Sequence, residues 1–169
     1  MDFVQRIWYH MMQKKAEETV PMIGLRHFCR EDAETVRSKT VPEMHPDEVE
    51  RMIADWNAGV FEGRYFEMFA VTKDGRIVGS ASVAERSQSA VSFGIEIFPE
   101  EQGKGIAPEA MRLLSEQAKE KGYRAVLDQV RTDNAASIRL HEKAGFESDG
   151  YAYRNRRGHE VVLYLKLLY

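Results

Sequence analysis

Along several short segments of the chain, hydrophobic and polar residues alternate or hydrophobic residues run together, and both patterns predict β-strands. The predicted strands are residues 24–29, 66–72, 77–84, 91–98, 125–130, 151–155 and 160–168. The Asp-Gly pair within residues 73–76 predicts a tight turn, so the strands on either side of it form an antiparallel hairpin. A last hairpin is expected around Arg157-Gly158.

Other segments repeat their hydrophobic residues at the spacing of a helix. Helices are predicted over residues 1–19, 32–39, 45–58 and 135–144, and over the run that follows Gly105 and ends at Gly122. One face of that last run carries Ala107, Ala110, Met111, Leu114 and Ala118. Such a stripe is typical of a helix packed on a sheet.

The first predicted helix has an apolar stripe of its own, made of Phe3, Ile7, Trp8 and Met11. It either packs on the surface of the same domain or forms a subunit contact, since exposed apolar stripes tend to mark interfaces. We therefore divide the chain into an N-terminal helical extension, residues 1–23, and one domain, residues 24–169.

The order of the elements predicts the sheet. A helix of sufficient length connects strand 91–98 to strand 125–130, so these two strands are expected to be parallel. Short turns join most of the other strands, which are expected to be antiparallel. The predicted fold class is α+β: one domain with a mixed, mostly antiparallel sheet flanked by helices.

Composition narrows the functional classes. The chain has 169 residues, enough for one domain with a real core, and a net charge of −3, which makes no electrostatic case for nucleic-acid binding. With Cys29 as its single cysteine it cannot form an internal disulfide, which indicates a reducing compartment. The chain has no apolar run of membrane-spanning length, and polar residues interrupt residues 1–15, so we expect no signal peptide and a cytoplasmic location.

The segment of residues 100–111 is the strongest functional signal. It places Gly103 and Gly105 between a predicted strand and a predicted helix, where backbone N–H groups can surround an anion. The segment lacks the spacing of a P-loop and of the three-glycine dinucleotide motif. By itself it is either a phosphate-binding loop or a plain strand-to-helix connection.

A second segment, residues 130–146, lies one strand downstream. With it, the chain resembles the GNAT superfamily of acyl-CoA-dependent N-acyltransferases. Gln102-x-x-Gly105-x-Ala107 matches the pyrophosphate loop of that family, and Asn134, followed by Leu140, Lys143 and Gly145-Phe146, matches its second signature. The detailed resemblance covers residues 66–168. The Gly-rich loop and its helix look closest to the ribosomal-protein-alanine and polyamine N-acetyltransferases, whereas residues 139–142 resemble the phosphinothricin-type acetyltransferases.

The resemblance implies a site for acetyl-CoA. Main-chain N–H groups of residues 103–107 (Gly103, Lys104, Gly105, Ile106 and Ala107), together with Gln102, would bind the pyrophosphate. The Lys104 side chain either meets a CoA phosphate or lies in solvent. The pantetheine arm would lie where strands 91–98 and 125–130 splay apart, against the main chain of Ile97 and Phe98, which otherwise serve only the sheet. Asn134 would touch the arm, cap the helix that follows it, or do both.

Acyl transfer needs a group to deprotonate the amine, donors for the oxyanion and a proton for the leaving thiolate. Glu96 is the best candidate base, because alternation places it opposite the apolar face of its strand and a carboxylate among apolar neighbours is costly unless it is paired or used. It is otherwise a structural ion pair or an exposed strand residue, and Glu85 is a weaker candidate base. The resemblance implies the N–H of Phe98 as oxyanion donor. His141 stands where relatives often carry a tyrosine acid, so it either protonates the thiolate or only packs beneath the CoA arm.

The resulting hypothesis is transfer of an acetyl group from acetyl-CoA to a primary amine by direct attack, without a metal. The acceptor is either a protein N-terminus or a small metabolite, and a homodimer is plausible. The competing hypothesis is a non-catalytic acyl-CoA-binding or regulatory module on the same fold, since fold does not determine function.

Overall fold

The computed structural model describes residue 5 and residues 21–169 of the chain. The predicted helix of residues 1–19, with its apolar stripe, therefore lies outside the described residues except for Gln5, which is helical. Within the described part, no helix is both long and apolar enough to cross a membrane.

The elements follow the predicted order closely. The strands are β1 (Ile23–His27), β2 (Val60–Phe61), β3 (Arg64–Lys73), β4 (Arg76–Ser87), β5 (Ala90–Ile97), β6 (Ala125–Arg131), β7 (Ala152–Arg154) and β8 (Glu160–Leu167). The helices are α2 (Ala33–Thr40), α3 (Pro46–Trp56), α4 (Ile106–Glu120) and α5 (Ala135–Lys143). Strand β2 and two short 3₁₀ turns, Arg30–Asp32 and Pro99–Glu101, were not predicted, because each is too short to show a periodic pattern.

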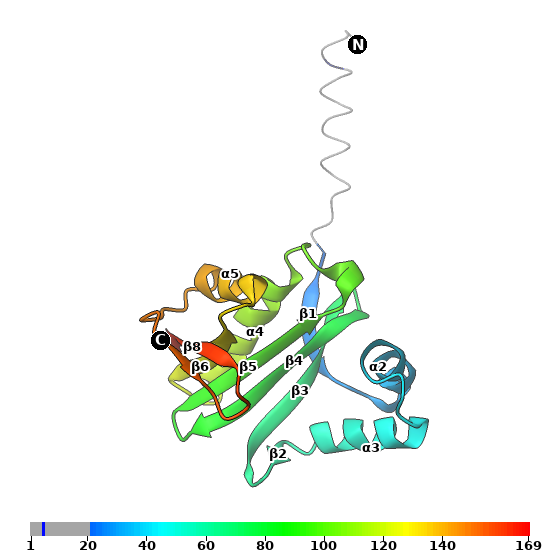
Figure 1. The fold of residues 1–169 in the computed structure, drawn as a ribbon. Coiled ribbons are helices and arrows are strands. Elements are labelled where there is room, and N and C mark those ends of the chain that lie inside the picture. The colour runs from blue at the N-terminus through cyan, green and yellow to red at the C-terminus, as the bar shows by residue number, and fades with distance from the viewer. Residues whose placement is uncertain (1–4, 6–20) are drawn as a thin grey trace.

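The strands form one eight-stranded sheet in the order β1-β3-β4-β5-β6-β8-β7, with β2 beside β3. Every neighbouring pair is antiparallel except β5 and β6, which are parallel (Figure 1). This confirms the predicted α+β class and the mixed sheet.

Helices cover both faces of the sheet (Figure 1). On one face α4 packs through Ala110, Met111 and Leu114 on the main core. The other face carries α2 and α3, whose residues Val36, Val49 and Ile53 pack with Ala70. Neighbouring residues of a strand point to opposite faces, so Phe69 in the main core and Ala70 in the second cluster mark the two sides.

Candidate active site

The loop before α4 is shaped for an anion. Gly103 and Gly105 have φ values of 74° and 76°, in the left-handed region that favours glycine. A Cβ atom added at either position would meet nothing within 4 Å, so the space in front of the loop is open. Gly105 is also the N-cap of α4 and gives no side-chain cap, so the first N–H groups of the helix have no capping side chain. An anion such as a pyrophosphate can accept hydrogen bonds from them.

Charged side chains hold this loop from behind. The buried carboxylate of Glu101 accepts hydrogen bonds from Arg76 at 2.7 Å and from Lys104 at 3.1 Å. The hydrogen bond from Arg76, and after it the one from Lys104, lowers the pKa of Glu101 to about 2. Glu101 is therefore ionised at neutral pH. Lys104 also donates to the carbonyl of Glu100 at 2.7 Å. The Lys104 side chain is exposed, as the solvated alternative expects, and its ammonium also contacts the loop's own acceptors.

Gln102 ties the loop to the end of β5. Its Nε2 donates to the carbonyl oxygen of Ile97 at 2.9 Å. The Gln of the loop motif therefore sets the direction in which the chain leaves the sheet.

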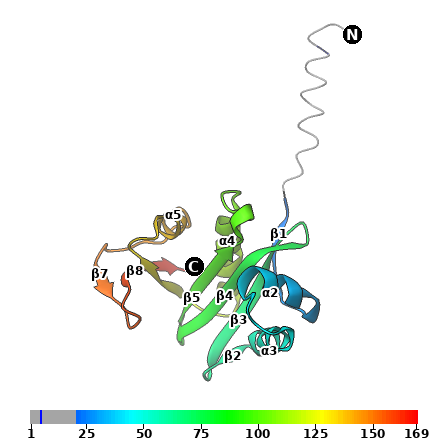
Figure 2. The same ribbon diagram turned by 45° about the vertical axis from the view of Figure 1, so that its right-hand side comes forward.

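The two parallel strands next to the loop separate early. Strands β5 and β6 pair only at Ala90 with Ala125 and at Val91 with Val126 (Figure 2). Beyond Val91, the edge of β5 that faces β6 has no strand partner among the described residues. This is the splay that the family resemblance implied.

Backbone hydrogen bonds show which residues of β5 face the gap that opens between β5 and β6 beyond Val91. The N–H of Phe93 points toward β6, whereas the N–H of Phe98 donates to Val78 of β4 at 2.9 Å. Because alternate residues of a strand direct their backbone groups to the same edge, Ile95 and Ile97 face the gap with Phe93. Phe98 N–H, expected as the oxyanion donor, is thus engaged within the sheet. Ile95 was missed, although counting alternate positions from Ile97 would have found it.

A buried pair of side chains lies at the start of the gap. Asp128 of β6 accepts the N–H of Phe93 on Oδ1 at 2.8 Å, and its Oδ2 lies 3.1 Å from Nε2 of His141 in α5. The other ring nitrogen of His141 donates to the backbone carbonyl of Ser137 at 2.8 Å. The ring also packs edge-on against Phe146 at 4.8 Å. Asp128 thus joins β5, β6 and α5 where the parallel pairing ends.

Both nitrogens of His141 are therefore engaged, each with an acceptor. The imidazolium, which donates from both, satisfies this geometry beside a carboxylate. To protonate a thiolate, the ring would have to give up one of these bonds. The sequence analysis did not identify Asp128. The signal that could have found it is a carboxylate inside the apolar strand 125–130, because a buried carboxylate needs a partner.

Glu96 lies on the opposite face of the sheet from Ile95 and Ile97. Its partner across β4 is Ser80, which in turn pairs with Ala70, so it lies on the side that carries α2 and α3. Its side chain is exposed, does not line the cavity described below and makes no hydrogen bond to the described residues. The predicted position of Glu96 opposite the apolar face of β5 is confirmed, whereas its cross-strand neighbour, Ser80, is polar rather than apolar.

Two other candidates occupy structural positions. Asn134 is the N-cap of α5, and its Oδ1 accepts the N–H of Ser137 at 3.0 Å, which confirms the expected cap. The carboxylate of Glu85 accepts from the N–H of Tyr65 at 3.3 Å and from the Tyr123 hydroxyl at 3.4 Å.

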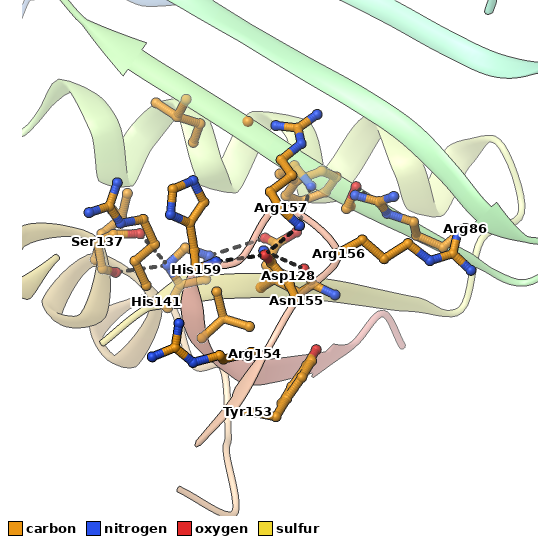
Figure 3. A pocket seen from close by; sticks show the side chains of 18 of the residues that line it. Arg86, Asp128, Ser137, His141, Tyr153, Arg154, Asn155, Arg156, Arg157 and His159 are labelled. Atoms are coloured by element: carbon orange, nitrogen blue, oxygen red, sulfur yellow. Dashed lines mark hydrogen bonds and ion pairs between the residues drawn. The ribbon is translucent and has the colours of Figure 1, made fainter. Parts of the chain in front are cut away.

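A cavity of about 870 Å³ opens beside the gap (Figure 3). Its walls come from β5 at Phe93, Gly94 and Ile95, from α5 at Leu140 and His141, and from the hairpin of β7 and β8. Residue 5 and residues 21–169 contain no group of three or more His, Cys, Asp or Glu side chains that could hold a metal ion. The geometry thus combines a Gly-rich loop at an uncapped helix N-terminus, an open strand edge and a cavity.

Comparison with protein families agrees with this geometry. The model of the acetyltransferase (GNAT) domain matches residues 21–147. The chain belongs to the GNAT family. The match takes in the Gly-rich loop, both splayed strands and all of the second motif segment, residues 130–146, so the GNAT motifs stand where the geometry places the site.

Individual GNAT relatives are more distant. An L-methionine sulfoximine/L-methionine sulfone acetyltransferase of Pseudomonas aeruginosa is 30% identical over 81 residues, which are 45% of this chain and 47% of the relative. A prophage-derived N-acetyltransferase of Bacillus subtilis is 33% identical over 99 residues, 57% of this chain and 56% of that protein. The chain thus spans about half the length of the curated relatives it matches.

Solved structures share the GNAT fold over most of the chain. A ribosomal L7/L12 alpha-N-protein acetyltransferase in complex with coenzyme A has a TM-score of 0.75 at 17% identity, covering 89% of this chain and 96% of that one. A spermidine N-acetyltransferase from Vibrio cholerae, in complex with CoA and spermine, has a TM-score of 0.69 at 21% identity and covers 86% and 95%.

Proposed function

We propose that this GNAT protein transfers the acetyl group of acetyl-CoA to the nitrogen of a primary amine. The observation that carries the proposal is the open edge of β5 beside the uncapped N-terminus of α4. The loop from Gly103 to Ala107 would hold the pyrophosphate, with Gln102 shaping it. The N–H groups of Ile95 and Ile97 would meet the amide-rich pantetheine arm as an added strand does. Asn134 would reach the arm with the amide nitrogen that its capping role leaves free.

The reaction would be a direct transfer. The lone pair of the neutral amine attacks the thioester carbon and forms the new C–N bond, the C–S bond breaks, and the sulfur leaves as a thiolate that takes up a proton. In this proposal His141 supplies that proton or holds Asp128 in place, and Glu96 accepts the proton of the amine, directly or through water. The single exposed cysteine, Cys29, is not needed as a nucleophile.

The proposal extends to location and assembly. With one cysteine in the chain, a cytoplasmic location is the setting we propose. The outer residues of β8, Leu163, Leu165 and Leu167, are exposed large apolar side chains and support a homodimer.

Thiol release tests the function. The protein is mixed with acetyl-CoA and separately with L-methionine sulfone, spermidine and a peptide with a free N-terminal serine, and free CoA is measured with a thiol reagent. We expect amine-dependent release that far exceeds hydrolysis without an amine. Tight CoA binding with no release for any amine would overturn the enzymatic proposal and leave the non-catalytic module.

We expect Glu96→Gln to lower kcat/KM most strongly near neutral pH and less at high pH. An amine with a pKa of about 10 is almost entirely protonated at pH 7, where a protein base helps, whereas at high pH the amine is already neutral. The measurement is a pH–rate profile of both forms, and the same profile of Glu85→Gln tests the weaker candidate base. Profiles that differ by a constant factor at every pH would assign Glu96 to positioning rather than proton transfer.

A further inference from the structure

Five arginines line the cavity beside the gap between β5 and β6. Arg86 comes from β4, Arg131 from β6, Arg154 from β7, and Arg156 and Arg157 from the turn between β7 and β8. They come from separate parts of the chain and line one cavity, where Figure 3 labels Arg86, Arg154, Arg156 and Arg157. Folding therefore collects these positive charges in one place.

Most of these arginines have no carboxylate partner. Arg131 pairs with Asp133, with Nε to Oδ1 at 2.9 Å. Arg86 donates to the Ser92 hydroxyl at 2.8 Å and Arg154 to the Gly158 carbonyl at 3.4 Å, both neutral acceptors. Neither guanidinium of the hairpin turn, at Arg156 and Arg157, makes a hydrogen bond or ion pair with residue 5 or residues 21–169.

Among the residues that line the cavity, Asp128 carries the one carboxylate that could neutralise these positive charges. That carboxylate is already engaged by His141 and by the N–H of Phe93. The exposed residues Arg86, Arg154, Arg156 and Arg157 therefore line the cavity with guanidinium groups that have no carboxylate partner among the described residues. Like charges held around a concave, partly closed space raise the local concentration of anions.

These arginines are separate from the proposed pyrophosphate loop. None of the loop residues 103–107 lines the cavity, whereas Phe93, Gly94 and Ile95, in the middle of β5, do. An anion held here would lie beside the strand edge where the thioester end of the arm is expected, and not at the nucleotide end. The charge is therefore available to the second substrate.

We propose that the acceptor is a small amine that also carries a carboxylate, of the amino-acid class, and that Arg156 and Arg157 bind this carboxylate. This deepens the proposed function and rests on it. The planar guanidinium forms two parallel hydrogen bonds with a carboxylate, which suits recognition of this group. A cavity of about 870 Å³ shared with the thioester is in the range of small-molecule sites, and a polyamine would meet mostly like charge there, because the one lining carboxylate, Asp128, is already hydrogen-bonded.

Matched acceptors give the test. L-Methionine and L-methioninamide share the amine and the side chain and differ in the carboxylate, and spermidine supplies a cationic amine. Rates are compared at a pH where the amines are mostly neutral. We expect kcat/KM for L-methionine to exceed that for the amide and for spermidine by about tenfold or more, a difference of about 1.4 kcal/mol. Preference for spermidine, or equal rates for acid and amide, would overturn the proposal while leaving acetyl transfer in place.

Variants locate the effect. Arg156→Gln and Arg157→Gln should each raise KM for L-methionine without changing KM for acetyl-CoA, and Arg156→Glu should shift preference toward spermidine. The control is Arg51→Gln, an exposed arginine of α3 outside this cavity, which should change neither value. An equal loss of acetyl-CoA affinity in Arg156→Gln would assign the arginines to the CoA phosphates and overturn the proposal. Turnover of acidic peptides and of no small acid would overturn it as well.

A binding measurement separates this proposal from the enzymatic one. N-acetyl-L-methionine should bind the CoA-loaded protein by calorimetry, and N-acetyl-L-methioninamide should bind about tenfold more weakly or worse. If no amine is turned over but this difference persists, the acetyl-transfer proposal fails and the anion site stands. If the difference is absent, the anion site fails, whatever the turnover.

Discussion

Gly105→Trp is expected to abolish acetyl-CoA binding by the folded protein. Gly105 has a φ of 76°, and the open space in front of it is where the pyrophosphate would lie. An indole there would fill that space and would also strain the left-handed backbone that turns the α4 N–H groups toward the ligand. Calorimetric titration with acetyl-CoA measures the loss, after circular dichroism has shown that the variant is folded.

Gly122→Trp is the matched control for backbone strain. Gly122 lies just past the other end of α4, has a φ of 90° and also has no heavy atom within 4 Å of an added Cβ. It should lose comparable stability and keep its acetyl-CoA affinity. Unchanged affinity in Gly105→Trp, or equal loss in both variants, would remove the loop from the site.

His141→Phe is expected to lower both stability and turnover while keeping most of the acetyl-CoA affinity. The substitution leaves the Asp128 carboxylate buried without its partner, and breaking a buried pair on one side typically costs about 3–5 kcal/mol in the free energy of unfolding. Turnover should fall on the order of 100-fold, whether the ring donates a proton or positions Asp128 at the gap. The measurements are denaturant unfolding, calorimetry with CoA, and kcat.

Asp128→Asn in the His141→Phe background tests the origin of the stability loss. The amide oxygen can still accept the N–H of Phe93, but the unpaired charge is gone, so the double variant should be more stable than His141→Phe alone. If turnover also recovers, His141 is a positioning residue; if it stays low, the ring itself is the proton donor. A fully active and fully stable His141→Phe would show that the pair has neither role.

Much of the fold was readable from local patterns. The Asp-Gly turn lies where β3 ends and β4 begins, and Gly122 and Gly145 follow the ends of α4 and α5 with positive φ. These signals work because a tight turn or a helix end restricts the backbone of a few adjacent residues. Beyond this, the parallel pairing of β5 and β6 followed from the length of the helix between them.

The partners of charged groups could not be read in this way. Lys104 donates to Glu101, its neighbour three positions earlier, and that carboxylate is also held by Arg76, which lies 25 positions before Glu101 in the chain. Glu96 was the best candidate base from its strand pattern, but its side chain is exposed and its cross-strand neighbour is Ser80. The register of the strands decides which charged side chains lie next to each other, and the register is a property of the whole sheet.

The amino-acid sequence by itself determined the family of this protein, its order of elements and the place of its anion-binding loop, because these depend on residues close together in the chain. Only the tertiary structure decided what the site contains. It engaged Phe98 N–H with Val78, directed Ile95 toward the gap and joined Asp128 to His141. It also gathered arginines from β4, β6 and the last hairpin around one cavity, since charges distant in sequence share a field only after the sheet brings them together.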